Sequence, residues 1–76
     1  MQTFDKVCKI IADNMGLDAD FNFTLETDWA DLDADSLDVV DVIMSIEEEF
    51  AIEISDWEIR DLNNLGDLVS LIDNKQ

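Results

Sequence analysis

The chain has 76 residues, 47% of them hydrophobic, and its 20 acidic and four basic residues give a formal net charge of −16. This length suits a single domain with one modest core, and the apolar content predicts a folded chain. The charge argues against nucleic acid and anionic membrane surfaces as partners and favours proteins with basic docking patches.

The only cysteine, Cys8, permits no internal disulfide, which is consistent with a reducing compartment. The sequence has no basic segment followed by an apolar run, and no apolar stretch long enough to cross a bilayer. We therefore expect a single domain over residues 1–76, in a soluble cytoplasmic monomer.

Residues 3–15 have the apolar spacing of an amphipathic helix, and Gly16 is well placed to end it. Cys8 lies on the apolar stripe, so we interpret it as a buried small hydrophobic residue. A catalytic thiol is disfavoured, because the chain has no histidine to activate it. The stripe comprises Phe4, Val7, Cys8, Ile11 and Met15.

Residues 17–35 form a long connection, for which we expect one turn of regular structure at most. Loops of this length in a small domain are usually functional or tied down. This one is too apolar for a free linker, so we expect it to lie across the helices and close the core from one side. Its apolar residues are Leu17, Phe21, Phe23, Leu25, Trp29 and Leu32.

Residues 36–50 give the clearest helical pattern in the chain. Asp35 stands at the N-cap position and Asp38 three residues later, where carboxylates accept backbone N–H groups and suit the helix dipole. A broad apolar stripe predicts the face that packs into the core. It comprises Val39, Val42, Ile43, Ile46 and Phe50.

A second side of this helix carries a small apolar patch with a rim of carboxylates, beside Ser36. Such a surface is typical of a partner-binding site. The alternative is that its apolar residues are additional core or scattered exposed side chains. This side comprises Leu37, Val40, Met44, Asp41, Glu47 and Glu48.

Residues 51–54 are expected to form a short extended link. Ser55 is placed to cap a short third helix over 56–62, and Asn64 to cap a last helix over 65–73. The last helix should direct Leu65, Leu68, Val69 and Ile72 inward. Together these elements predict an all-α fold, a small four-helix bundle with a long loop between its first two helices.

Ser36 stands at the start of the 36–50 helix, but a catalytic serine needs a positioned base. The chain has no histidine, and its lysines lie far from Ser36 in sequence, so we expect no catalytic residue. Two interpretations of Ser36 remain. It is either an ordinary helix-terminal serine or a residue that another enzyme modifies.

Asp31, Asp33 and Asp35 have the 1-3-5 spacing of a calcium-binding loop. The sixth position is then Ser36 instead of glycine, and the twelfth is Val42 instead of glutamate. Because such a loop needs both residues, we expect no metal site here, only loose divalent binding to carboxylates.

The run from Asp31 to Ile54 resembles the acyl carrier proteins, and the resemblance extends over nearly all of the chain. Its basis is Asp35-Ser36-Leu37-Asp38, then Ser45-Ile46-Glu47-Glu48-Glu49-Phe50, then Ile52-Glu53-Ile54. Three positions depart from the family pattern. Asp33 replaces the usual glycine, Ser55 replaces a common proline, and Trp29 stands one residue away from the usual loop aromatic.

The resemblance implies a carrier that is not an enzyme, with 4′-phosphopantetheine from coenzyme A on Ser36 and acyl thioesters on its thiol. It implies as partners a phosphopantetheinyl transferase and acyl-transfer or synthase enzymes with basic docking patches. The recognition residues it implies are Asp35, Leu37, Asp38, Val40, Asp41, Met44, Glu47 and Glu48. We expect a role in fatty acid biosynthesis. A carrier for polyketide or nonribosomal peptide synthesis, or an unmodified acidic interaction module, remain alternatives.

Overall fold

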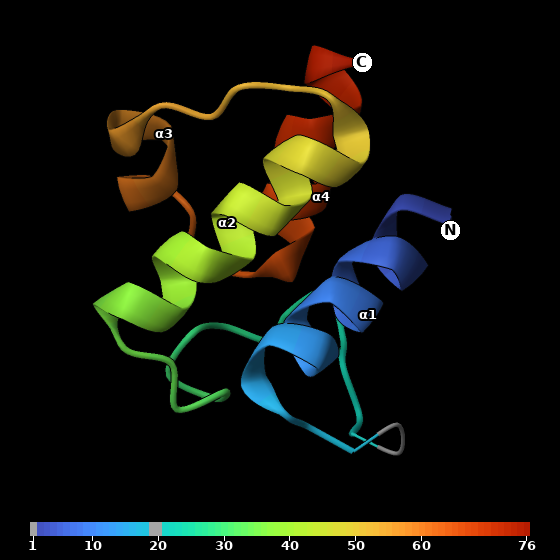
Figure 1. The fold of residues 1–76 in the computed structure, drawn as a ribbon, viewed down its shortest axis with the longest axis vertical. Helices are drawn as coiled ribbons and strands as arrows, with labels where there is room; N and C mark the ends of the chain where they lie inside the picture. Colours follow the sequence, from blue (N-terminus) through green and yellow to red (C-terminus); the bar gives the residue numbers. More distant parts are fainter. Residues whose placement is uncertain (1, 19–20) are drawn as a thin grey trace.

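The computed structural model describes residues 2–18 and 21–76, and over these residues the chain forms four helices and no strand. The helices are α1 (Gln2–Met15), α2 (Ser36–Phe50), α3 (Asp56–Arg60) and α4 (Leu65–Lys75). Helix α1 packs against both α2 and α4 (Figure 1). The all-α prediction is confirmed. None of the described helices is both long and apolar enough to cross a membrane.

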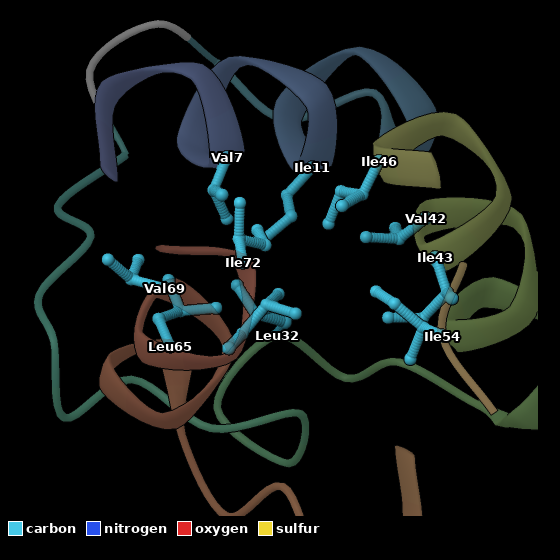
Figure 2. Packing of buried hydrophobic residues seen from close by; sticks show 11 residues of the cluster. Val7, Ile11, Leu32, Val42, Ile43, Ile46, Ile54, Leu65, Val69 and Ile72 are labelled. Carbon is cyan, nitrogen blue, oxygen red and sulfur yellow. The ribbon is translucent and has the colours of Figure 1, made fainter. Parts of the chain in front are cut away.

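The core is built from one face of each of the three longer helices, with contributions from the loop and the link (Figure 2). The inward face predicted for α4 is confirmed, and Val39 and Phe50 of the α2 stripe are half-buried at the edge of the core. The buried apolar residues are Val7, Ile11, Leu32, Val42, Ile43, Ile46, Ile54, Leu65, Leu68, Val69 and Ile72.

The predicted bounds of α2 are confirmed, whereas those of α3 and α4 were each wrong by two residues at the C-terminal end. Helix α3 ends at Arg60, where the last turn tightens. The Asp61 N–H is shared between the Trp57 carbonyl at 3.3 Å and the Glu58 carbonyl at 3.2 Å, and the Leu62 N–H donates three residues back, to the Ile59 carbonyl at 3.1 Å. Helix α4 continues to Lys75, whose cation suits a helix C-terminus.

The 17–35 connection packs on the core as predicted, with residues 19–20 outside the described ranges. Leu32 is buried, and four other apolar residues are half-buried against the core: Leu17, Phe21, Phe23 and Trp29. The prediction was wrong for Leu25, whose side chain is 43% exposed.

The backbone of this loop, and not the Leu25 side chain, makes the contact with α4. Gly66 N–H donates to the Leu25 carbonyl at 2.7 Å, and Leu65 N–H to the Thr27 carbonyl at 2.8 Å. These bonds satisfy N–H groups that the first turn of a helix leaves without partners. A Cβ at residue 66 would lie 3.1 Å from the Leu25 oxygen, so this close approach favours glycine.

Candidate functional site

Ser36 is the first residue of α2, and its side chain is exposed. The capping of α2 is performed by two aspartates. Asp35 Oδ1 accepts from the Asp38 N–H at 3.0 Å, and Asp38 Oδ2 accepts from the Asp35 N–H at 3.2 Å. This reciprocal pair is a capping box. Ser36 therefore presents a hydroxyl that the helix terminus does not use as its cap.

A tight turn immediately before Asp35 fixes where α2 begins. Asp33 has φ 57°, in the left-handed region. The Ala34 N–H donates to the Trp29 carbonyl at 3.0 Å, and the Asp33 N–H to the Ala30 carbonyl at 3.1 Å. This pair of bonds is the closure that usually ends a helix with glycine in the left-handed position. Asp33 takes that conformation here because a short polar side chain tolerates it better than most others do.

The aspartates with the spacing of a calcium loop serve separate turns. Asp31 Oδ2 accepts from the Asp28 N–H at 3.2 Å, whereas Asp35 Oδ1 accepts from the Asp38 N–H. Over residues 2–18 and 21–76, no three His, Cys, Asp or Glu side chains are grouped so that they could hold a metal ion.

The apolar patch beside Ser36 lies outside the core. Leu37, Val40 and Met44 are 74%, 48% and 57% exposed. The interpretation of these residues as additional core is therefore wrong, and an unpartnered apolar patch on one helix face remains. Of the predicted acidic rim, Asp35, Asp41 and Glu48 are exposed, and Asp38 and Glu47 are half-buried.

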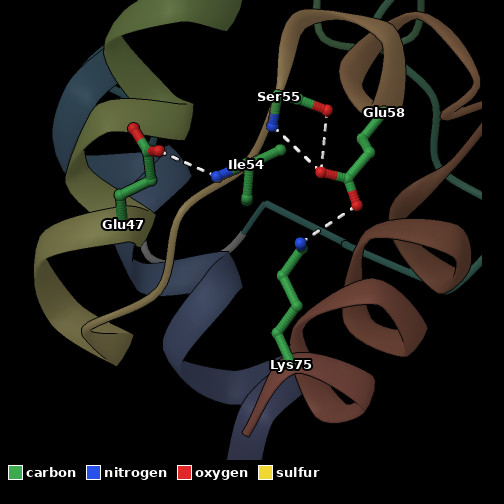
Figure 3. Close-up of polar contacts among 5 residues, drawn as sticks. All are labelled: Glu47, Ile54, Ser55, Glu58 and Lys75. Carbon is green, nitrogen blue, oxygen red and sulfur yellow. Dashed lines mark hydrogen bonds and ion pairs between the residues drawn. The ribbon is translucent and has the colours of Figure 1, made fainter.

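Glu47 has a structural contact that its place in the sequence does not indicate. Its Oε2 accepts a 2.9 Å hydrogen bond from the partly buried N–H of Ile54, which ties the link after α2 back to that helix (Figure 3). The helical spacing of Glu47 places it correctly beside Met44, but spacing within a helix carries no signal for a bond to a residue beyond its end.

Glu58 forms the second polar connection in this region (Figure 3). One carboxylate oxygen accepts from Ser55 N–H at 3.0 Å and from Ser55 Oγ at 2.8 Å, and the other lies 3.0 Å from Lys75 Nζ. The Ser55 backbone N–H, followed by Lys75 and the Ser55 hydroxyl, lowers the pKa of Glu58. The Ser-x-x-Glu spacing is a sequence signal for the first part of this arrangement.

Cys8 is half-buried on α1. Burial, and then the negative charge of Asp5, raise the pKa of its thiol to about 11. The thiol is therefore protonated at neutral pH, which agrees with its interpretation as a packing residue, since a nucleophile would require the thiolate.

Comparisons with known proteins match this chain over nearly its whole length. The family model described as the phosphopantetheine attachment site matches residues 5–72. The holo acyl carrier protein from Geobacter metallireducens has 34% sequence identity and a TM-score of 0.88, over 99% of this chain and 86% of that chain. The acyl carrier protein from Thermotoga maritima also has 34% identity, with a TM-score of 0.80 over 93% of this chain and 82% of that chain.

Proposed function

This chain belongs to the acyl carrier proteins, whose cofactor is phosphopantetheine, and from that membership we propose that Ser36 bears the arm. The observation that carries the proposal is the exposed hydroxyl at the first position of α2, beside a cap formed by Asp35 and Asp38. An incoming transferase meets a hydroxyl that is neither buried nor engaged as the cap.

The start of α2 suits a phosphate on Ser36. By helix geometry the N–H groups of Ser36 and Leu37 have no carbonyl partner inside α2, while the N–H groups of Asp35 and Asp38 are occupied by the capping box. Free N–H groups and the positive end of the helix dipole favour an anion there. The arm supplies a thiol that holds acyl groups as thioesters. The protein supplies the attachment point and the surface that partner enzymes recognise.

We further propose that the exposed side of α2 is the face that partner enzymes recognise. Its apolar centre, Leu37, Val40 and Met44, lies next to Ser36, and its exposed carboxylates suit basic patches on a transferase or a synthase. Opposite charges accelerate encounter, which matters for a carrier that visits several enzymes in turn.

The pathway that we propose is fatty acid biosynthesis in the cytoplasm, with the carrier acting as a monomer. The acidic α2 supports this choice, because it resembles the recognition helix of carriers in that pathway. A carrier for polyketide or nonribosomal peptide synthesis is the alternative. Mass analysis of the acyl groups on protein isolated from its own cells discriminates: simple fatty acyl chains support the proposal, and polyketide or aminoacyl groups contradict it.

The attachment site is tested by incubating the protein with coenzyme A and a broad-specificity phosphopantetheinyl transferase, followed by intact mass measurement. The wild-type chain should gain one phosphopantetheine and Ser36→Ala none. Ser70→Ala is the matched control, because Ser70 is an exposed serine on α4 and its loss should leave the mass gain unchanged. An unmodified wild type, or a modified Ser36→Ala, would contradict the proposal and favour an unmodified interaction module.

A further inference from the structure

Trp57 is an exposed tryptophan on α3, a helix that contacts the core through the half-buried Ile59. Its side chain is 65% exposed, and none of the five described residues of α3 is buried. The other tryptophan, Trp29, is half-buried against the core. Trp57 therefore makes little contribution to packing, and tryptophan is one of the residue types enriched at binding hot spots.

The indole borders two hollows of the surface. One, of about 300 Å³, lies between α3 and α4 and is lined also by Leu62, Leu71, Asp61 and Asp67. The other lies between the end of α2, the link and α4, and its lining includes Glu47, Glu53, Ile54 and Lys75.

Glu47 connects the second hollow to the face proposed for recognition. It lines that hollow and stands three residues after Met44 on α2, so the two are neighbours on the helix surface. A partner seated on Met44 that extends toward α3 therefore meets Trp57, without crossing to another side of the molecule.

The surroundings of Trp57 favour a cation. Two nearby carboxylates have partners: Glu58 has Lys75, and Glu47 has the Ile54 N–H. Glu53, Asp56 and Asp61 are exposed against one exposed cation of α3, Arg60, so carboxylates outnumber cations around the indole, in a chain of net charge −16. The face of an indole attracts cations, and a guanidinium stacks on it more readily than an ammonium because it is planar and more weakly hydrated.

We infer that Trp57 extends the recognition face onto α3 and stacks against an arginine on the basic surface of a partner synthase. This inference rests on the proposed carrier function, and it assigns to Trp57 a role in partner choice. A second copy of this chain is a poor occupant, because its own net charge of −16 opposes approach to an acidic rim.

The test compares the wild type with Trp57→Gln and Trp57→Phe, each carrying an acyl thioester on the phosphopantetheine arm, as acyl donors to a fatty-acid β-ketoacyl synthase. Loss of one cation–π contact predicts a KM for the carrier raised roughly 3- to 30-fold in Trp57→Gln, with kcat unchanged. Trp57→Phe retains an aromatic face and should stay close to wild type. Since α3 has no buried residue, both variants should retain helicity and melting temperature.

A second measurement identifies the occupant. In a Trp29→Phe background Trp57 is the sole tryptophan, because the chain has two. Protection of its fluorescence from acrylamide on addition of the synthase supports the inference. If protection already appears when the arm is attached, the indole contacts the arm. If it appears when the carrier alone is concentrated, the indole contacts a second copy of the chain. Either result would overturn the inference.

The experiments distinguish a failure of the proposed attachment at Ser36 from a failure of the inference about Trp57. If the wild-type chain gains no mass with the transferase, the attachment at Ser36 fails. If the mass gain is normal but Trp57→Gln has the wild-type KM, only the inference about Trp57 fails.

Discussion

The carboxylate of Glu58 lies 3.0 Å from the ammonium group of Lys75, and this ion pair joins α3 to the last turn of α4. The same carboxylate accepts two hydrogen bonds from Ser55, one from the backbone N–H and one from the hydroxyl. Helix α3 has no fully buried side chain and packs on the core through the half-buried Ile59, so polar contacts of this kind contribute to holding it in place. Its attachment should therefore depend on the charge of Glu58.

Glu58→Gln should lower the free energy of unfolding at pH 7, because glutamine keeps a hydrogen-bond acceptor but loses the charge. The pKa of Glu58 is lowered from its ordinary value of 4.5 by the Ser55 N–H, and further by Lys75 and the Ser55 hydroxyl. A lowered folded-state pKa means that its stabilisation is fully present above about pH 4.5 and is lost as pH falls through the folded-state pKa. Urea unfolding from pH 7 to pH 3 should show that the difference in unfolding free energy between wild type and Glu58→Gln decreases below pH 4.5.

Glu53→Gln is the matched control for this experiment, since Glu53 is an exposed carboxylate on the link that precedes α3. The unfolding free energy of Glu53→Gln should differ little from that of the wild type, and this small difference should not decrease below pH 4.5. If the difference in unfolding free energy between wild type and Glu58→Gln is constant from pH 7 to pH 3, the charge of Glu58 does not help to hold α3.

Glu47 and Glu48 are adjacent, yet they should respond differently to charge reversal. Glu47→Lys removes the acceptor of the Ile54 N–H, which is partly buried, and should cost about 1–2 kcal/mol of unfolding free energy. Glu48→Lys, on an exposed side chain, should change stability by less than about 0.5 kcal/mol. Glu48→Lys should instead slow acyl transfer from a partner synthase and weaken its salt dependence, as expected of a rim charge.

Glu47→Gln separates the two roles of Glu47, because the amide oxygen can still accept from Ile54 while the charge is gone. It should fold with nearly wild-type stability. Equal stability of Glu47→Lys and Glu48→Lys in urea would show that the Ile54 bond contributes nothing measurable. Transfer rates unaltered by Glu48→Lys would exclude Glu48 from the recognition face.

Local signals in the sequence predicted the part of the molecule that carries the proposed function. The bounds of α2 follow from Asp35 and Asp38 at its start and from an uninterrupted helical period up to Phe50. The exposure of Leu37 follows from the same period, because it lies off the stripe that packs inward. The position and exposure of Ser36 at the start of α2 are therefore consequences of local sequence alone.

The specific hydrogen bonds between segments were not predicted, because periodicity describes only one helix at a time. The exposure of Leu25 reflects a loop whose carbonyl faces Gly66 on α4, and neither residue carries a local mark of that approach. The bond from Ile54 to Glu47 likewise depends on the chain reversing after α2. That reversal occurs at Ala51, for which an extended conformation was predicted and which instead has φ 55° in the left-handed region.

The left-handed conformation at Ala51 predicts that glycine is the better residue there. Ala51 follows the last residue of α2, and its N–H and the Ile52 N–H both point to the Glu47 carbonyl, which closes the helix. For a residue with a Cβ this conformation costs about 1–2 kcal/mol, whereas glycine adds about 0.4–1 kcal/mol of unfolded-state entropy. Ala51→Gly should therefore raise the free energy of unfolding by about 0.5–1 kcal/mol.

Asp33→Gly addresses the same conformation at φ 57°, but aspartate tolerates it better, so its gain should be smaller than that of Ala51→Gly. Ala30→Gly is the control, for which we expect a change in unfolding free energy of the opposite sign. Ala30 is also exposed but has no positive φ, so the entropy term acts alone and should destabilise by about 0.5–1 kcal/mol. Urea unfolding of the three variants gives the ranking. If Ala51→Gly destabilises the protein as much as Ala30→Gly does, the left-handed conformation at Ala51 stores no backbone strain. The position of the hydrogen bond between Glu47 and Ile54 would then need another explanation.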